Sequence, residues 1–95
     1  MAKDTEFDAV DYLDNPNVIA DYLSEAFLTG NEEFAADALG NVARAKGMSS
    51  VAKDTGLRRE SLYRCLSRRG HPRLDTTMKV LNSLDMELVV RPKAA

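Results

Sequence analysis

Residues 48–67 have the sequence MSSVAKDTGLRRESLYRCLS, and their small and apolar residues fall where two helices that cross at a tight turn need them. Ala52 stands where the first helix touches the second, and a larger side chain would push the helices apart. Gly56 takes the turn, where we expect a positive φ. The residues expected to face the remaining core are Val51, Leu57, Leu62 and Leu66, with Cys65 packing as a small apolar residue. The stretch therefore predicts helices at about 50–55 and 59–68.

The outer face of the second helix is rich in arginine, and this pattern is typical of a helix-turn-helix whose second helix enters the major groove of DNA. Arginine can pair with guanine O6 and N7, glutamate can accept from cytosine N4, and the outer arginines can contact phosphates. Serine hydroxyls and backbone N–H groups at the start of the first helix offer a further phosphate contact. The residues predicted to bind DNA are Ser49, Ser50, Arg58, Arg59, Glu60, Ser61, Tyr63, Arg64, Ser67 and Arg68, with Arg69 and Arg73 following them.

Charge is divided along the chain, although the formal net charge is only −2. Residues 1–43 hold one base and ten acids, a net of −9, whereas residues 44–95 hold twelve bases and five acids, a net of +7. Because phosphate binding depends on local potential rather than total charge, the basic half suits nucleic acid and the acidic half suits a different partner. The alternative is that both sets of charges only solvate the surface.

Three further helices are expected. Asn15-Pro16 is a helix entry, and a helix over 16–28 would bury Val18, Ile19, Tyr22, Leu23, Ala26 and Phe27. Asn31 caps the next helix, over 32–46, which would bury Phe34, Ala35, Ala38, Leu39, Val42 and Ala43 before Gly47 ends it. A last helix over 75–84, capped by Asp75, carries Leu74, Met78, Leu81 and Leu84 on one side.

The end of the chain allows one short strand. Met86-Glu87-Leu88-Val89-Val90 alternates loosely, and this segment can pair with residues 7–10 or with a second subunit. We therefore expect an all-α fold, a compact five-helix domain of the phage-repressor-like type, with or without a C-terminal β-strand. One domain would span 1–95, with acidic helices in 1–47, the helix-turn-helix in 48–69, and the last helix and optional strand in 70–95.

Several function classes are disfavoured. The sequence has no run of about 18 apolar residues, which is the length needed to cross a bilayer. The N-terminus opens into acidic residues rather than the basic and then apolar regions of a signal peptide, so we expect a soluble, cytoplasmic protein. One cysteine supplies neither a disulfide within the chain nor enough ligands for structural zinc, and we expect no metal and no cofactor. His71 is the single histidine and is interpreted as a loop residue near phosphate rather than a catalytic base. An enzyme such as a small nuclease lacks a metal-ligand cluster, so no enzymatic activity is expected.

Nearly the whole chain resembles the antidote proteins of bacterial toxin–antitoxin modules, within the phage-repressor-like (XRE/HigA-like) helix-turn-helix regulators. The residues that carry this resemblance are Phe7-Asp8, Tyr12-Leu13, IADYL at 19–23, ALGNVARAKGM at 38–48, GLRRESLY at 56–63 and Gly70-His71-Pro72. The resemblance implies an all-helical repressor-type domain that neutralises a small basic RelE/ParE-like toxin. It also implies repression of its own operon, as a homodimer on palindromic operator DNA.

Three positions depart from the family pattern. Arg58 stands where serine commonly caps the second helix of the motif, so a cap worth roughly 0.5 to 2 kcal/mol is expected to be missing. His71 replaces an asparagine and Asp85 a glycine, which affects the expected turn conformations rather than the fold. Two alternatives stay open: a stand-alone helix-turn-helix regulator, and a protein-interaction module that has lost DNA binding.

Overall fold

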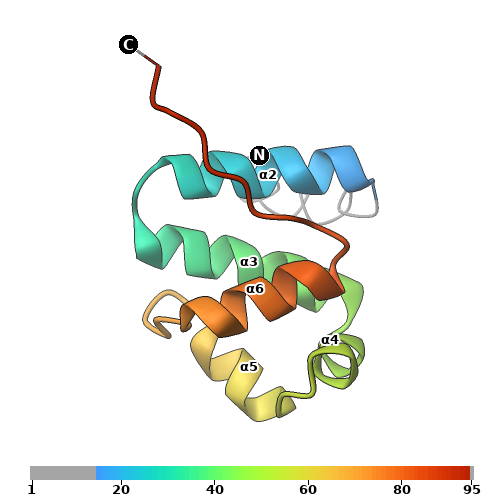
Figure 1. Cartoon of the computed structure of the whole chain (residues 1–95). Helices are drawn as coiled ribbons and strands as arrows, with labels where there is room; N and C mark the ends of the chain where they lie inside the picture. Colours follow the sequence, from blue (N-terminus) through green and yellow to red (C-terminus); the bar gives the residue numbers. More distant parts are fainter. Residues whose placement is uncertain (1–14, 95) are drawn as a thin grey trace, which may run out of the picture.

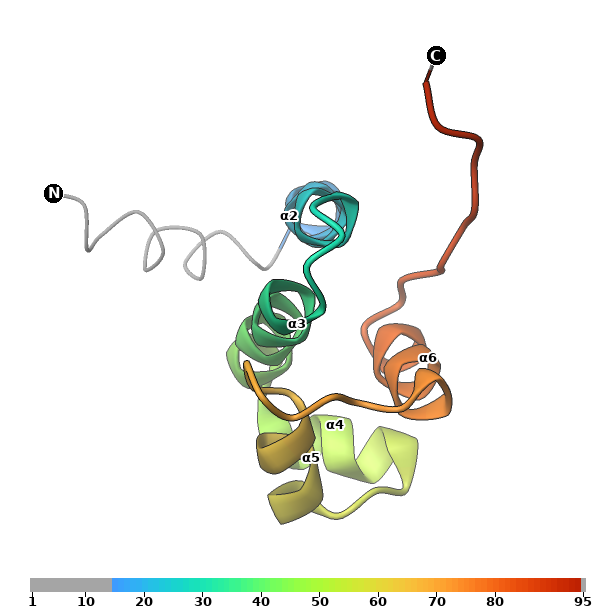
Figure 2. The same cartoon turned by 90° about the vertical axis from the view of Figure 1, so that its left-hand side faces the viewer.

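A computed structural model describes residues 15–94, which form a bundle of five helices without a strand (Figure 1). The helices are α2 (Pro16–Leu28), α3 (Glu32–Lys46), α4 (Met48–Thr55), α5 (Arg59–Cys65) and α6 (Leu74–Ser83). In both views α3 lies between α2 on one side and α4 and α5 on the other, and α6 packs across α4 (Figures 1 and 2). None of these helices has the length and hydropathy that a bilayer crossing needs. The expected all-α, five-helix architecture is confirmed.

The first two helices have the predicted bounds because asparagine side chains cap both of them. Asn15 Oδ1 accepts hydrogen bonds from the backbone N–H groups of Asn17 at 2.9 Å and Val18 at 3.4 Å, and Pro16 fills the first helical position. Asn31 Oδ1 accepts from the Phe34 N–H at 3.0 Å, and two glutamates follow in the first turn of α3. Local capping therefore fixes these boundaries.

The bounds of the other helices differ from prediction. α4 begins at Met48 instead of residue 50, because Gly47, with φ 116°, is its N-cap and the Gly47 carbonyl accepts from the Val51 N–H at 3.1 Å. α5 ends at Cys65 rather than residue 68, where Leu66 leaves helical geometry at φ −93°, ψ 54°.

The prediction that Asp75 caps α6 is wrong, because the N-cap is Arg73, in an extended conformation. Asp75 lies in the first turn instead. Its Oδ1 accepts from the Thr76 N–H at 2.8 Å and lies 3.3 Å from Arg73 Nε.

The optional C-terminal strand is absent from the described chain. Residues 86–94, here called the C-terminal segment, follow α6 without helix or strand. The Met86 N–H donates to the Leu81 carbonyl at 2.9 Å, and no backbone hydrogen bond beyond it involves residues 87–94 within the part of the chain that the structure describes. A strand needs a neighbour to satisfy its backbone, and the expected neighbour at residues 7–10 lies outside the described residues.

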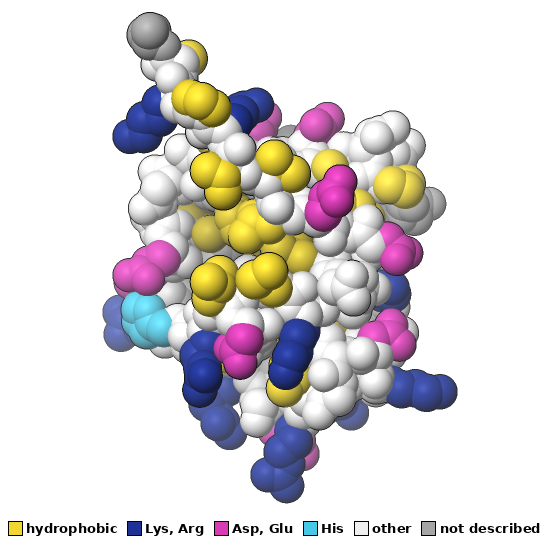
Figure 3. All heavy atoms as spheres, in the orientation of Figure 1, with side chains coloured by type: hydrophobic (Ala, Val, Ile, Leu, Met, Phe, Trp, Pro, Cys, Tyr) yellow, Lys and Arg dark blue, Asp and Glu magenta, His cyan; other side chains and the backbone are white. Residues whose placement is uncertain are grey.

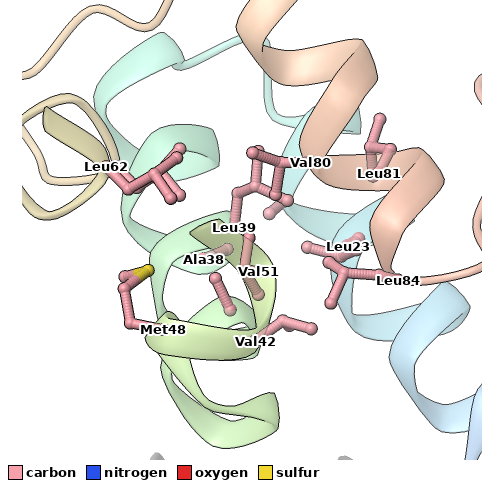
Figure 4. Close-up of a cluster of buried hydrophobic side chains, with 13 residues drawn as sticks. Leu23, Ala38, Leu39, Val42, Met48, Val51, Leu62, Val80, Leu81 and Leu84 are labelled. Atoms are coloured by element: carbon pink, nitrogen blue, oxygen red, sulfur yellow. The ribbon is translucent and has the colours of Figure 1, made fainter. Parts of the chain in front are cut away.

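The core contains buried side chains from every described helix (Figure 4). Its largest fully buried members are Leu39, Leu62, Leu66, Val42, Val51 and Val80. The expected burial of Val18 and Phe34 is wrong, because both are exposed, Phe34 to 48%. Leu74 and Met78, which the sequence places on one side of the last helix with Leu81 and Leu84, are 68% and 54% exposed. Val18, Phe34 and Leu74 lie in the first turns of their helices, and α6 turns Val80, Leu81 and Leu84 toward the core, which leaves Met78 outside.

Candidate nucleic-acid interface

The α4–turn–α5 unit has the geometry that its sequence predicts. Gly56 adopts the left-handed conformation at φ 74°, ψ 15°, and its N–H donates to the Ala52 carbonyl at 2.9 Å. Thr55 Oγ1 donates to the Val51 carbonyl at 2.8 Å and accepts from the Leu57 N–H at 3.3 Å. The turn is therefore closed by hydrogen bonds on both sides of the glycine.

One face of α5 is buried against the core, so the opposite face is exposed to solvent. Leu62 and Leu66 are fully buried, and Cys65 is half-buried against the core with its Sγ 3.7 Å from the Leu62 carbonyl oxygen. Burial raises the pKa of the Cys65 thiol, and the backbone hydrogen bond and the Arg64 charge oppose this shift. These features fit the expectation of a packed thiol rather than a reactive one.

The outside of α5 and the loop after it carry the arginine face, which we define as Arg58, Arg59, Arg64, Arg68 and Arg69. All five are exposed, and no carboxylate of residues 15–94 lies within ion-pair distance of their guanidinium groups. Figure 3 shows lysine and arginine side chains gathered around this end of the molecule. Their positive charge is not neutralised within the described chain and is available to a polyanion.

Other predicted contact residues divide into exposed and half-buried groups. Glu60 and Tyr63 are exposed, and the Tyr63 ring lies 5.7 Å from the Arg59 guanidinium carbon, which restrains that arginine through a cation–π contact. Ser61 is half-buried, as is Ser67, whose Oγ donates to the Arg64 carbonyl at 2.8 Å. The Ser67 hydroxyl is therefore already used within the chain.

The two serines of α4 are exposed in its first turn. Ser49 and Ser50 make no side-chain capping bond, because Gly47 occupies the N-cap position. The first turn of α4 therefore presents backbone N–H groups and two hydroxyls on the surface.

The N-terminus of α5 lacks a side-chain cap, as expected from its sequence. Arg58 occupies the N-cap position in an extended conformation at φ −74°, ψ 138°, and its side chain makes no capping bond. The helix has only seven residues, so packing rather than capping holds it in place.

Two glycines, Gly40 and Gly70, let other parts of the chain approach the backbone at the C-terminal end of α5, which the sequence pattern did not predict. A Cβ atom on Gly40, in the middle of α3, would overlap the carbonyl oxygen of Leu66. A Cβ on Gly70 would overlap the carbonyl oxygens of Arg64 and Cys65. Because neither residue has a Cβ, α3 and the loop after α5 both approach the α5 backbone closely. A glycine inside a predicted helix was the available signal for this close approach.

The two unusual turn residues adopt positive φ values. His71 has φ 48° and Asp85 has φ 59°, where asparagine and glycine are more readily accepted. His71 Nδ1 lies 3.8 Å from Glu32 Oε1 at the start of α3, and both side chains are exposed. Within residues 15–94 no cluster of three or more His, Cys, Asp or Glu side chains could hold a metal ion.

Among the described residues, exposed acids of the acidic half lie on α2 and at the start of α3. Asp21 and Glu25 are exposed on α2, and Glu32 is exposed on α3. Tyr22 is half-buried between these helices, and its hydroxyl accepts from Asn41 Nδ2 at 2.9 Å. Asp21 and Glu25 on α2 lie on the far side of α3 from α5, so they are separated from the arginine face, whereas Glu32 reaches the loop after α5 at His71 (Figures 1 and 2).

Comparison with known proteins gives two matches. The profile of the family described as "probable addiction module antidote protein" matches residues 3–92. A protein of Haemophilus influenzae, named only as uncharacterized, is 40% identical over 86 residues, which cover 90% of this chain and 89% of the relative. No solved structure gave a match to this chain.

Proposed function

The chain belongs to the family of probable addiction module antidote proteins, and from this premise we propose that it is the antitoxin of a bacterial type II toxin–antitoxin module. In this proposal α4 and α5 bind operator DNA, which represses the protein's own operon. The acidic surface of α2 and α3 binds and neutralises a small basic toxin of the RelE/ParE type. The protein acts by binding, without catalysis and without a cofactor.

The observation that carries DNA binding is the arginine face on a helix whose opposite side is buried. Arg59 and Arg64 project from α5 itself and are the candidates for bidentate contacts with guanine. Arg58, Arg68 and Arg69 flank the helix, where they suit the phosphates on either side of the groove. Ser49 and Ser50, at the start of α4, suit a further phosphate.

The position of α5 supports sequence-specific binding in addition to charge attraction. A base contact requires a side chain to be held within a fraction of an ångström, and the core residues Leu62 and Leu66 and the close approach at Gly40 anchor the α5 backbone. The cation–π contact with Tyr63 further limits the positions that Arg59 can adopt. A mobile arginine tail would bind DNA without discriminating between sequences.

The test is fluorescence anisotropy of the full chain on DNA from its own upstream region and on a scrambled duplex, over a salt series. We expect the double variant Arg59→Ala, Arg64→Ala to weaken upstream binding by about a hundredfold or more, because each lost base contact costs roughly 1 to 3 kcal/mol. The matched control is Lys79→Ala, Lys93→Ala, which removes the same charge from exposed positions outside the arginine face. Equal binding to both duplexes, unchanged in the arginine variant, would refute operator recognition and leave a partner-binding module as the function.

A second experiment tests the toxin surface separately. Asp21→Lys, Glu25→Lys reverses two exposed charges on α2, on the far side of α3 from α5. We expect this variant to lose protection against the co-expressed toxin of the neighbouring gene while it keeps operator affinity. The arginine variant should keep protection and lose operator affinity. If one variant loses both activities with an intact fold, the proposal of two separate surfaces is wrong.

A further inference from the structure

The C-terminal segment carries apolar side chains that the rest of the described chain leaves exposed. Leu88, Val89 and Val90 are 46%, 74% and 94% exposed. Figures 1 and 2 show the segment leaving α6, passing α2 and ending away from the helices. Leucine and β-branched residues favour the extended conformation, and their backbone donors and acceptors are unused here. The segment can therefore form a β-strand once a second strand pairs with it.

An apolar groove lies beside this segment, between α2 and α6. Figure 3 shows it as a hollow of hydrophobic side chains in the face of the molecule. Its lining includes Leu23, Phe27, Leu28, Leu81, Leu88 and Val89. Glu87 and Arg91 also line it, so the apolar residues of the segment stand between one negative and one positive side chain.

The order of charged and apolar residues in this segment allows two copies of it to pair with matched side chains. Residues 87–91 have the sequence ELVVR, and antiparallel pairing of two copies about Val89 places Glu87 of each copy opposite Arg91 of the other. The same register places Leu88 opposite Val90 twice and Val89 opposite itself. Both ion pairs and both apolar pairs therefore form together in a single two-fold arrangement.

We propose that residues 87–91 pair with the same residues of a second copy as a two-stranded antiparallel ribbon centred on Val89, and that this ribbon covers the apolar groove of each subunit. Side chains alternate in a strand, so Leu88 and Val90 of both copies form one apolar face. Val89 and the charged pairs form the other face. Leu88 is the least exposed of the three apolar residues in the single chain, whereas Val90 on the same face is 94% exposed and would be covered only in the ribbon.

The groove gives the ribbon the support that two isolated strands lack. A two-stranded ribbon alone is marginally stable in water, but packing against an apolar surface stabilises it. The single chain shows no strand because, in this proposal, the second strand of the ribbon belongs to another molecule. This inference rests on the proposed function, because a two-fold dimer is what a palindromic operator accepts. Its test uses neither DNA nor toxin, so that the two proposals can fail separately.

The first test is charge reversal in the full chain, with dimerisation followed by sedimentation equilibrium. Glu87→Arg places arginines opposite each other twice, and Arg91→Glu does the same with carboxylates, so each should raise the dimer Kd by about tenfold. The double variant Glu87→Arg, Arg91→Glu should restore the wild-type Kd. A one-to-one mixture of the two single variants should form heterodimers preferentially, because only the mixed pair has opposite charges at both positions.

The second test identifies the register by disulfide cross-linking in a Cys65→Ser background. Val89→Cys places two thiols directly opposite each other at the two-fold axis, where a non-hydrogen-bonded pair brings the Cβ atoms to about 4.5 Å, the upper end of the separation that a disulfide accepts. Val90→Cys is the matched control, because the two thiols that it introduces lie diagonally across the ribbon and farther apart. We expect Val89→Cys to cross-link at least about tenfold faster than the control under mild oxidation.

A monomer at all accessible concentrations overturns the proposal and assigns the groove to another occupant, such as residues 1–14 of the same chain. A dimer whose Kd does not respond to the single charge reversals also overturns it, since the interface then lies elsewhere. Circular dichroism of each variant verifies the fold. The substituted side chains at 87 and 91 are exposed, so loss of folding is not expected.

Discussion

Replacement of Gly40 by alanine tests how α3 holds α5 in position. An alanine Cβ at residue 40 would lie inside the van der Waals distance of the Leu66 carbonyl oxygen, 3.2 Å from the Leu66 carbonyl carbon and 3.1 Å from Arg44 Nη1. The arginine can move at little cost because it is long and exposed. The Leu66 carbonyl is backbone next to a fully buried side chain, so the end of α5 must shift.

Two opposing effects set the change in stability. Alanine is favoured over glycine inside a helix by about 0.8 to 1.0 kcal/mol. Forcing an extra methyl group into a packed contact costs typically about 1 to 3 kcal/mol, and the upper part of that range applies here because the obstacle is backbone. We therefore expect Gly40→Ala to lower the free energy of unfolding by about 1 to 2 kcal/mol. In a domain of this size the melting temperature would fall by roughly 4 to 15 °C.

The assay is urea denaturation together with thermal unfolding, followed by circular dichroism. Ala45→Gly, an exposed position in the last turn of the same helix, measures the helix-propensity effect alone and should cost up to about 1 kcal/mol. At a temperature where Gly40→Ala is folded, a shift of α5 should also weaken operator binding. A Gly40→Ala protein that is about 1 kcal/mol more stable than wild type would show that propensity dominates and that the close contact with Leu66 does not constrain the fold.

Single residues elsewhere in the chain give three more expected outcomes. Arg58→Ser supplies the missing N-cap hydroxyl of α5, so the free energy of unfolding in urea should rise by about 0.5 to 2 kcal/mol. The same variant loses one phosphate contact, so the slope of log affinity for DNA against log salt concentration should fall by about one. Arg58→Ala should show only the second of these effects. Asp85→Gly removes a side chain from a residue with φ 59° and should stabilise the protein by about 1 kcal/mol in thermal unfolding, a gain that Asp85→Ala should not give. Cys65 should react with iodoacetamide at pH 8 more slowly than free cysteine, because its raised pKa leaves less thiolate at that pH; equal rates in the native and urea-unfolded protein would contradict its packing.

Sequence reasoning succeeded where short-range chemistry decides the structure. The starts of α2 and α3 are fixed by Asn15 and Asn31, each of which bonds to N–H groups two or three residues away. The turn between α4 and α5 depends on Gly56 alone for its left-handed residue. The exposed arginines of α5 followed in turn from the positions of Leu62 and Leu66, because one buried face determines the other.

Prediction from the sequence failed where contacts between distant parts of the chain determine the structure. α5 ends at Cys65, beside the close approach of α3 at Gly40; the glycine inside the predicted helix signals a close approach, but not which part of the chain approaches. On α6 the sequence offers two adjacent apolar stripes, and the choice of Val80 over Met78 depends on where the other helices lie. The strand expected at residues 86–90 requires a partner backbone, and the sequence does not state which chain provides it.

The order of helix contacts also has a kinetic consequence. Apart from the packing of α6 on α4, the main contacts join consecutive helices, α2 with α3, α3 with α4, and α4 with α5. Short loops must close to form such contacts, and helical proteins of low contact order fold in about microseconds to milliseconds. A newly synthesised chain can therefore build its structure from the N-terminal side as each helix emerges from the ribosome. Because synthesis at about 5 to 20 residues per second is far slower than such folding, the time that this chain needs to become competent to bind is set by its synthesis rather than by its folding.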